Sequence, residues 1–197
     1  MSAPSITLHT GDLPPGLTFK GSVAVDTETT GLDASRARIL QIGAIGVQRG
    51  RIEPERGFEI LVNPGEAVPQ ESSRIHGITD DRLAGQPDFP EAWARFQEFA
   101  GARILVGHSI GFDLAVMERE CRMASLPWTK PRALCTRLLA TVANPNLADH
   151  SLEMVASWLG VEIAGRHTAL GDAAAAGEIF AALLPELRKR NVRTLGE

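Results

Sequence analysis

Four acidic residues and one histidine stand in segments whose other residues are mostly apolar or small: Asp26, Glu28, Asp113, His167 and Asp172. Burying a carboxylate costs several kcal/mol unless it is paired or bound to a cation. Four carboxylates that converge are therefore typical of a site for divalent metal ions, which prefer oxygen ligands. Divalent metal ions with a histidine beside them are an arrangement typical of sites that hydrolyse phosphodiesters.

Asp26 and Glu28 end a segment, SVAVDTE, that is apolar on both faces until the first acid. This pattern predicts a buried central strand over residues 22–28, in which side chains at i and i+2 share a face. The two acids then extend the row of Ala24 at the carboxyl end of the strand, where α/β sheets bind ligands. A polar strand end without function is the alternative. The small residues that follow, TTG at 29–31, favour function because they leave space and free N–H groups for a ligand.

Asp113 and Asp172 each lie near the start of a predicted helix, on the side that its apolar residues share. Spacings of three, four and eight residues align Asp113 with apolar side chains up to Cys121, and Asp172 is aligned in the same way with Leu183. The alternative for Asp113 is a carboxylate that the helix dipole favours in a first turn. His167 precedes Asp172 by five residues, a position suited to a general base.

The elements that must position these residues alternate between strands and helices. Strands are predicted over 22–28, 39–47, 58–63, 103–109 and 133–136, and the short spacing of the first three indicates an antiparallel meander. Helices are predicted over 111–124, 151–160 and 169–184 and around Trp93, with a turn-rich stretch at 63–81. The fold class is therefore α/β, with a mixed five-stranded sheet flanked by helices.

The 197 residues predict one α/β domain at 21–186, after a lead-in at 1–20 and before a tail at 187–197. The net charge of −4 provides no global basic field, although acidic sites lower the net charge of many nucleic-acid enzymes. The two cysteines are too far apart for a zinc knuckle and indicate free thiols. There is no leader pattern and no run of about 18 apolar residues, so we expect a cytoplasmic protein without a membrane partner.

Together the segments resemble the DEDDh 3′–5′ exonuclease superfamily, whose familiar member is the proofreading epsilon subunit of bacterial DNA polymerase III. VAVDTETTGL is similar to the first motif of this superfamily, GHSIGFD to the second and HTALGDA to the third; IHGIT resembles a further loop. The likeness runs from about residue 22 to 185. The sister subfamily has Tyr where this chain has Thr168, and the chain contains no tyrosine, so only the histidine subfamily fits.

The resemblance implies a ribonuclease H-like fold and a role for each motif. Asp26, Glu28, Asp113 and Asp172 would bind two Mg²⁺ or Mn²⁺ ions, and His167 would be the general base. The terminal nucleotide would contact Thr29, Gly31, Leu32, Glu71, His76 and Phe112. For Leu32 and Phe112, a place in the hydrophobic core is an equal alternative.

The partner implied is the 3′ end of DNA or RNA, and sequence alone does not separate the two because recognition of a 2′-hydroxyl depends on the shape of the pocket. Two other functions stay open: a non-catalytic nucleic-acid-binding or polymerase-associated module, and a phosphodiesterase acting on free nucleotides. A polymerase or an additional domain is a further expected partner. Lys130, Arg132 and Arg137 form a loose basic group that we expect near the site, where they serve either a phosphate backbone or solubility.

Overall fold

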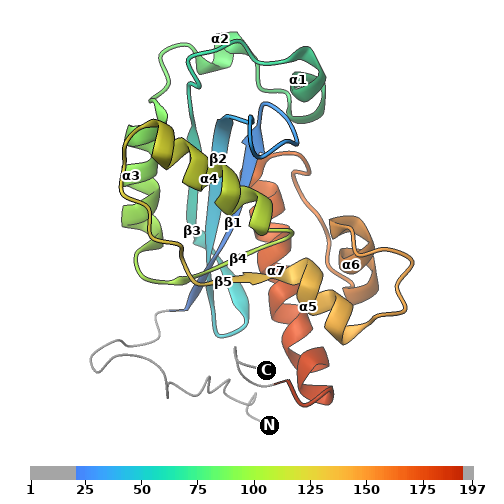
Figure 1. The fold of residues 1–197 in the computed structure, drawn as a ribbon. Helices are drawn as coiled ribbons and strands as arrows, with labels where there is room; N and C mark the ends of the chain where they lie inside the picture. Colours follow the sequence, from blue (N-terminus) through green and yellow to red (C-terminus); the bar gives the residue numbers. More distant parts are fainter. Residues whose placement is uncertain (1–20, 193–197) are drawn as a thin grey trace.

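The computed structural model describes residues 21–192, so the predicted lead-in at 1–20 and the last residues of the predicted tail, 193–197, lie outside it. Five strands form one sheet in the order β3-β2-β1-β4-β5 (Figure 1). The strands are β1 (Ser22–Thr29), β2 (Ile39–Gln48), β3 (Arg51–Leu61), β4 (Ile104–Gly107) and β5 (Ala133–Cys135).

The sheet has the predicted mixture of directions. β1 and β2 pair antiparallel, as do β2 and β3, which confirms the meander. β4 runs parallel to β1, and β5 runs parallel to β4. The order of strands makes β1 the centre of the sheet, with two neighbours on each side. The first acids of the sequence are thus carried by the central strand.

The predicted bounds were wrong for two elements. β3 begins at Arg51 rather than at 58, because a tight turn after Gln48 pairs its polar, mostly exposed first residues with the end of β2. Those residues do not alternate between apolar and polar, so their sequence gave no strand signal. The final helix continues to Lys189 rather than ending at 184, although it contains Pro185, because Leu187 is still buried in the core.

The helices include two short ones in the stretch predicted to be turns, and one, α5, that was not predicted. α1 ends at His76, and Gly77 follows in the left-handed conformation with a φ of 69°. The helices are α1 (Gln70–His76), α2 (Asp80–Leu83), α3 (Phe89–Ala100), α4 (Gly111–Met123), α5 (Thr136–Ala143), α6 (Leu152–Leu159) and α7 (Ala169–Lys189).

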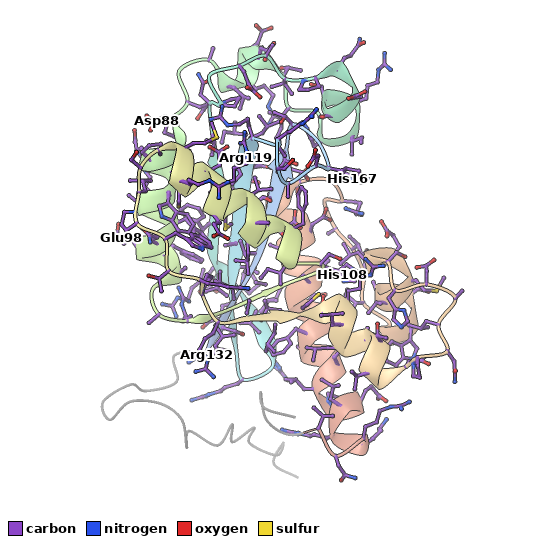
Figure 2. All side chains as sticks on the ribbon, in the orientation of Figure 1. Asp88, Glu98, His108, Arg119, Arg132 and His167 are labelled. Carbon is purple, nitrogen blue, oxygen red and sulfur yellow. The ribbon has the colours of Figure 1, made fainter. Side chains whose placement is uncertain are left out.

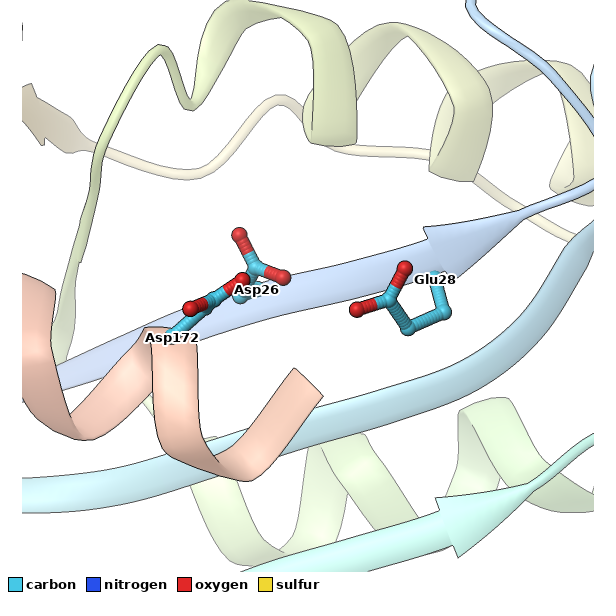
Figure 3. Close-up of side chains that lie close together, drawn as sticks. All are labelled: Asp26, Glu28 and Asp172. Carbon is cyan, nitrogen blue, oxygen red and sulfur yellow. The ribbon is translucent and has the colours of Figure 1, made fainter. Parts of the chain in front are cut away.

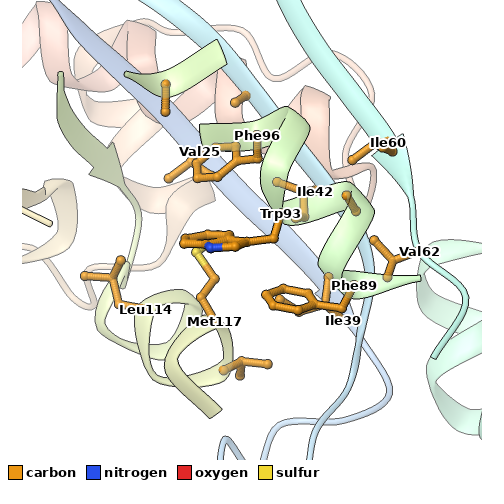
Figure 4. Close-up of a cluster of buried hydrophobic side chains, with 14 of the residues drawn as sticks. Val25, Ile39, Ile42, Ile60, Val62, Phe89, Trp93, Phe96, Leu114 and Met117 are labelled. Atoms are coloured by element: carbon orange, nitrogen blue, oxygen red, sulfur yellow. The ribbon is translucent and has the colours of Figure 1, made fainter. Parts of the chain in front are cut away.

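Helices cover both faces of the sheet (Figure 1). On one face, β1 and β2 pack against α3 and α4 through a large apolar cluster that includes Val25, Trp93 and Met117 (Figure 4). On the other face lies α7, which contacts β1, β2 and β3 and is itself covered by α5 and α6. Within residues 21–192, no helix is long and apolar enough to cross a membrane.

The close packing of α7 on the sheet depends on small residues. At Gly177, an added Cβ would lie 2.9 Å from Cγ2 of Ile52 and 3.1 Å from Cβ of Ala24. A larger side chain there would push the helix away from the sheet. The start of the same helix carries Asp172, so this packing also sets the position of a predicted metal ligand.

Candidate metal centre and active site

Three of the predicted acids meet at the carboxyl end of β1. Asp26 and Glu28 project from the same face of the strand, and Asp172 reaches them from the first turn of α7 (Figure 3). One carboxylate oxygen from each of the three lies within 4.8 Å of the others. Ligand atoms this close can share a cation, and oxygen ligands suit the hard ions Mg²⁺ and Mn²⁺.

The approach of α7 to the sheet is fixed by a glycine and a glutamine on β2. Gly43 is paired with Asp26, and a Cβ added to Gly43 would lie 2.1 Å from the carbonyl carbon of Ala169. The buried Gln41 accepts a hydrogen bond of 3.1 Å from the backbone N–H of Ala169. The backbone of α7 therefore rests directly on β2, and this contact brings Asp172 to the end of β1.

Asp113, the fourth predicted ligand, lies outside this group of three. It is buried in the first turn of α4, as its apolar alignment predicted. Its Oδ1 accepts hydrogen bonds from the backbone N–H of Thr27 at 3.1 Å and from the hydroxyl of Thr27 at 2.7 Å. Thr27 alternates with Asp26 along the strand, so these bonds join the α4 side of the sheet to the strand that carries Asp26 and Glu28. The role of Asp113 as a ligand stays a prediction.

Burial and mutual repulsion make the acids unusually easy to protonate. Burial, followed by the charges of Asp113, Asp172 and Glu28, raises the pKa of Asp26 well above its usual value. Burial and then repulsion from Asp172 raise the pKa of Glu28 to about 7. Acids with strongly raised pKa values are frequent at functional sites. A divalent cation would relieve the repulsion between them and stabilise their charged forms.

The residues present fit a divalent metal ion. Oδ1 of Asp172 is buried and has no hydrogen-bond partner among the residues that the structure describes. An unpartnered buried carboxylate oxygen costs free energy unless a cation or water satisfies it. The orphaned oxygen belongs to the same group that Asp26 and Glu28 complete.

Arg166 also reaches this group, and our reading of the sequence missed it. Its Nε donates to Oε1 of Glu153 at 2.7 Å, and its Nη1 donates to Oδ2 of Asp172. The signal was available, because a basic residue stands directly before the predicted general base in the motif GRHTALGDA. Glu153, on α6, is distant in the sequence and carried no such signal.

His167 lies at the rim of the acid group. It is exposed and has a φ of 62°, and Thr168 after it caps α7 by accepting the N–H of Gly171 at 3.1 Å. The cap turns the chain sharply just before the helix that bears Asp172. An exposed imidazole beside metal ligands can reach solvent and substrate, as a general base requires.

His76 is the second histidine on this side of the molecule. Nδ1 of its buried ring accepts the N–H of Ile78 at 3.1 Å, whereas Nε2 has no partner within residues 21–192. Burial lowers its pKa, and the charges of Arg82 and His167 lower it further. The backbone of Thr29 also acts on this ring, so His76 lies against the end of β1. Contact of His76 with a substrate remains a prediction.

The other predicted substrate residues belong to the loop after β1 and to α1. The hydroxyl of Thr29 donates to the carbonyl of Gly31 at 2.8 Å, and Ser72 on α1 donates to the carbonyl of Thr30 at 2.7 Å. Glu71 is exposed on that same helix. The structure thus joins α1 to the first motif, although it contains no substrate.

The two residues with a core alternative differ. Leu32 is 91% exposed, so the core alternative was wrong for it and it is free to contact a ligand. Phe112 is partly buried against the apolar cluster of α3 and α4, which supports its core alternative.

Two of the three predicted basic residues do not lie near the acids. Lys130 and Arg132 line a cavity of about 230 Å³ beside Trp93 and Leu105, at the start of β4. Because β4 is parallel to β1, this is the opposite end of the sheet from Asp26. Arg132 and His167 accordingly lie far apart in Figure 2. The expectation that these two basic residues lie near the site was wrong. They precede β5, which runs parallel to β1 through β4, so they lie at the amino ends of these strands, whereas the acids lie at the carboxyl end of β1.

Comparison with known proteins gives a consistent picture. The model of a family described as exonuclease matches residues 23–180. The chain is 39% identical over 183 residues to a DNA polymerase III subunit epsilon-like protein of Rhodobacter capsulatus, covering 91% of this chain but 25% of that protein. It is 34% identical over 165 residues to the DNA polymerase III subunit epsilon of Aquifex aeolicus, covering 84% of this chain and 81% of that subunit.

Among solved structures, the fold resembles that of Exonuclease X in complex with 5′ overhanging duplex DNA. The TM-score is 0.65 at 23% identity, and the match covers 86% of this chain and 92% of the other. At this identity the likeness concerns the fold alone: the mixed sheet with helices on both faces.

Proposed function

This chain belongs to the exonuclease family, and on that premise we propose that it is a metal-dependent 3′–5′ exonuclease acting on DNA. It would remove nucleoside 5′-monophosphates from a single-stranded or frayed 3′ end. The observation that carries this proposal is the meeting of Asp26, Glu28 and Asp172 within 4.8 Å, next to an exposed histidine.

Asp26, Glu28 and Asp172 would hold Mg²⁺ or Mn²⁺, with Asp113 as the fourth acid, in a site for two ions. When bound, the ions would supply the positive charge that activates a water nucleophile and stabilises the leaving oxygen. The protein's own contribution is to fix the acids in position, through Gly43 and Gln41 beneath α7.

His167 would take the proton from the attacking water. Its imidazole must be neutral to do so, and its exposure lets the proton pass on to solvent. Its position directly before the α7 cap keeps it near Asp172, whose pKa it lowers, but it does not belong to the group of three acids. The imidazole is therefore proposed as a base and not as a metal ligand.

The substrate end would lie between the loop after β1 and α1. Leu32 is an exposed apolar side chain in the loop that follows β1, suited to stack against the last base. His76 offers Nε2, and Glu71, Thr29 and Gly31 complete the surroundings of the terminal nucleotide. A frayed or single-stranded end avoids the free-energy cost of unpairing.

The relatives support DNA as substrate and a polymerase as partner, because the 34%-identical Aquifex aeolicus protein is a subunit of DNA polymerase III. The chain spans only 25% of the Rhodobacter capsulatus relative, so an additional domain is another partner consistent with the comparisons. We place the activity in the cytoplasm.

The proposal is tested with 5′-labelled single-stranded DNA, frayed duplex DNA and RNA of the same sequence, in Mn²⁺ and in EDTA. We expect a ladder that shortens from the 3′ end of DNA, requires metal, and is absent for Asp26→Asn. Faster shortening of RNA would assign the enzyme to RNA trimming instead. Cleavage of a circular single strand, or activity that survives EDTA, would contradict the proposal.

A further inference from the structure

Arg166 connects two acids that belong to different elements. Its Nε donates to Glu153 on α6 at 2.7 Å, while its Nη1 donates to Oδ2 of Asp172 on α7. The side chain of Asp172 is 7% exposed and that of Glu153 is 56% exposed, so the arginine joins a buried carboxylate to a solvated one. The bond to the buried partner is the stronger constraint, because water competes with it less.

The charge of Arg166 acts on the entire acid group. Burial raises the pKa values of Asp26, Glu28 and Asp172, and the guanidinium opposes this rise at all three. Arginine stays protonated under all ordinary conditions, so this charge is permanent. One fixed cation therefore offsets part of the repulsion that a divalent metal would otherwise relieve.

We propose that Arg166 competes with the divalent metal for Asp172, and that Glu153 holds the guanidinium when the metal takes its place. The inference rests on the proposed metal centre. The arginine would keep the acids together when no metal is bound and would set the concentration of metal that the site requires.

The geometry allows this exchange with a small movement. The two carboxylates use different nitrogens of the guanidinium, so the bond to Glu153 can persist while the bond to Asp172 breaks. Such a movement needs only side-chain torsions, since Arg166 and Glu153 both lie outside the core. Repulsion between the guanidinium and a metal ion drives the separation.

The test uses the full chain, stripped of metal with EDTA and dialysed, and titrated with Mn²⁺ in a calorimeter. Arg166→Gln should bind Mn²⁺ roughly tenfold more tightly than the wild type, as expected for loss of one competing hydrogen bond to a charged, nearly buried carboxylate. Arg137→Gln is the matched control. Like Arg166, Arg137 acts on the pKa of His108, but its charge is not among those that shift the pKa values of the three acids. Its loss should change the affinity less than about twofold.

A double-mutant cycle of Glu153→Gln and Arg166→Gln distinguishes transfer of the guanidinium to Glu153 from a general effect of net charge on Mn²⁺ affinity. Glu153→Gln should weaken Mn²⁺ binding in the wild type, because the displaced arginine loses its other partner. In the Arg166→Gln background the same change should have no effect, whereas a general loss of negative charge would weaken binding in both. Arg166→Gln should also lower the melting temperature in EDTA and show a larger stabilisation by Mn²⁺ than the wild type.

The outcomes distinguish this inference from the proposed function. If the wild type binds no Mn²⁺, or if Asp26→Asn binds it equally well, the metal centre itself is wrong. If the wild type binds Mn²⁺ but Arg166→Gln binds it no more tightly, competition by Arg166 is overturned. Should Arg166→Gln fail to fold, Glu153→Gln is compared with Glu162→Gln, which removes the same charge from an exposed residue. Weaker Mn²⁺ binding by Glu153→Gln than by Glu162→Gln supports the exchange, and equal binding by the two variants overturns it.

Discussion

At the scale of single residues, the acids of this site do unequal work. Asp26 and Asp172 supply oxygens to the group of three, whereas Asp113 spends one of its oxygens on two hydrogen bonds from Thr27. A carboxylate can accept these bonds through one oxygen and still offer the other to a metal. Asp113 would then be a metal ligand, and Thr27 would orient it without binding the metal itself.

We expect Asp113→Asn to abolish activity, and Thr27→Val to reduce it by about 10- to 100-fold, the usual effect of losing a group that orients a metal ligand. Single-turnover rates at saturating Mn²⁺ would measure both. If Asp113→Asn kept full activity and lost only thermal stability, Asp113 would be a structural acceptor for Thr27 and not a ligand.

His167→Gln should lose roughly 10²–10⁴-fold in turnover, which is the usual contribution of a general base. Its Mn²⁺ affinity should be nearly that of the wild type, because the imidazole is not a proposed ligand. Calorimetry and turnover measured on one preparation separate the two effects. His150→Gln is the control for loss of a histidine outside the three motifs; its Nε2 bonds to the carbonyl of Asn144. Retention of normal turnover by His167→Gln would remove His167 from the mechanism.

At the scale of elements, the site depends on how closely α7 lies on β2. A Cβ at Gly43 would meet backbone atoms of Ala169 and Leu170, both at 2.1 Å. Backbone cannot rotate away as a flexible side chain can, so the helix itself must shift. A shift of α7 moves Asp172 away from Asp26.

Gly43→Ala should therefore destabilise the fold by about 1–3 kcal/mol or more and remove most of the activity. Gly57→Ala on the neighbouring strand is the matched control, because its Cβ would find only ordinary contacts at 3.7 Å and beyond. Urea unfolding and the exonuclease assay would be measured for both. Equal activity of the two variants would show that Asp172 does not need this contact.

The sequence predicted β1 and the apolar sides of α4 and α7 because their patterns are strong: a run of buried residues ends in two acids, and helical spacing aligns Asp113 and Asp172. The meander followed from short spacing. The sequence did not predict the contact of Gly43 with Ala169, because a glycine within a strand does not show which backbone segment packs against it. α5 was missed because its residues, TRLLATVA, follow directly on the last strand without a separate start signal.

The other features that the sequence did not predict are contacts between residues of different elements. Arg166 was overlooked because its value comes from Glu153 and Asp172, which only the packing of α6 beside α7 brings to it. The position of Lys130 and Arg132 at the other end of the sheet likewise depends on the direction of β5, which only the fold shows. Residues within one motif were predictable, whereas relations between motifs required the fold.

At the scale of the whole molecule, stability and metal binding are coupled through the acids. Burial and then repulsion from Asp172 raise the pKa of Glu28 from 4.5 to about 7 in the folded protein. A raised pKa contributes stability that is fully present below the unfolded value and is lost as pH rises through the folded value. In EDTA, the free energy of unfolding should therefore decrease as the pH rises from about 4.5 to about 7, because Glu28 loses its proton in the folded protein over this range.

Glu28→Gln removes this titration, so in EDTA its melting temperature should rise relative to the wild type as the pH increases from about 5 to about 8. The exposed Glu162→Gln is the control and should show no such trend. With Mn²⁺ added, the advantage of Glu28→Gln should shrink or reverse. A constant difference across this range would show that Glu28 carries no extra proton affinity in the fold.

The pairing of β1 with α7 also bears on how such a protein is made. Asp26 and Glu28 belong to the first strand and Asp172 to the last helix, so a ribosome releases the two halves of the site at very different times. Asp26, Glu28 and Asp113 are synthesised before Asp172, so a growing chain cannot form the group of three acids. On the proposed mechanism, hydrolysis would therefore begin only after α7 has packed on the sheet.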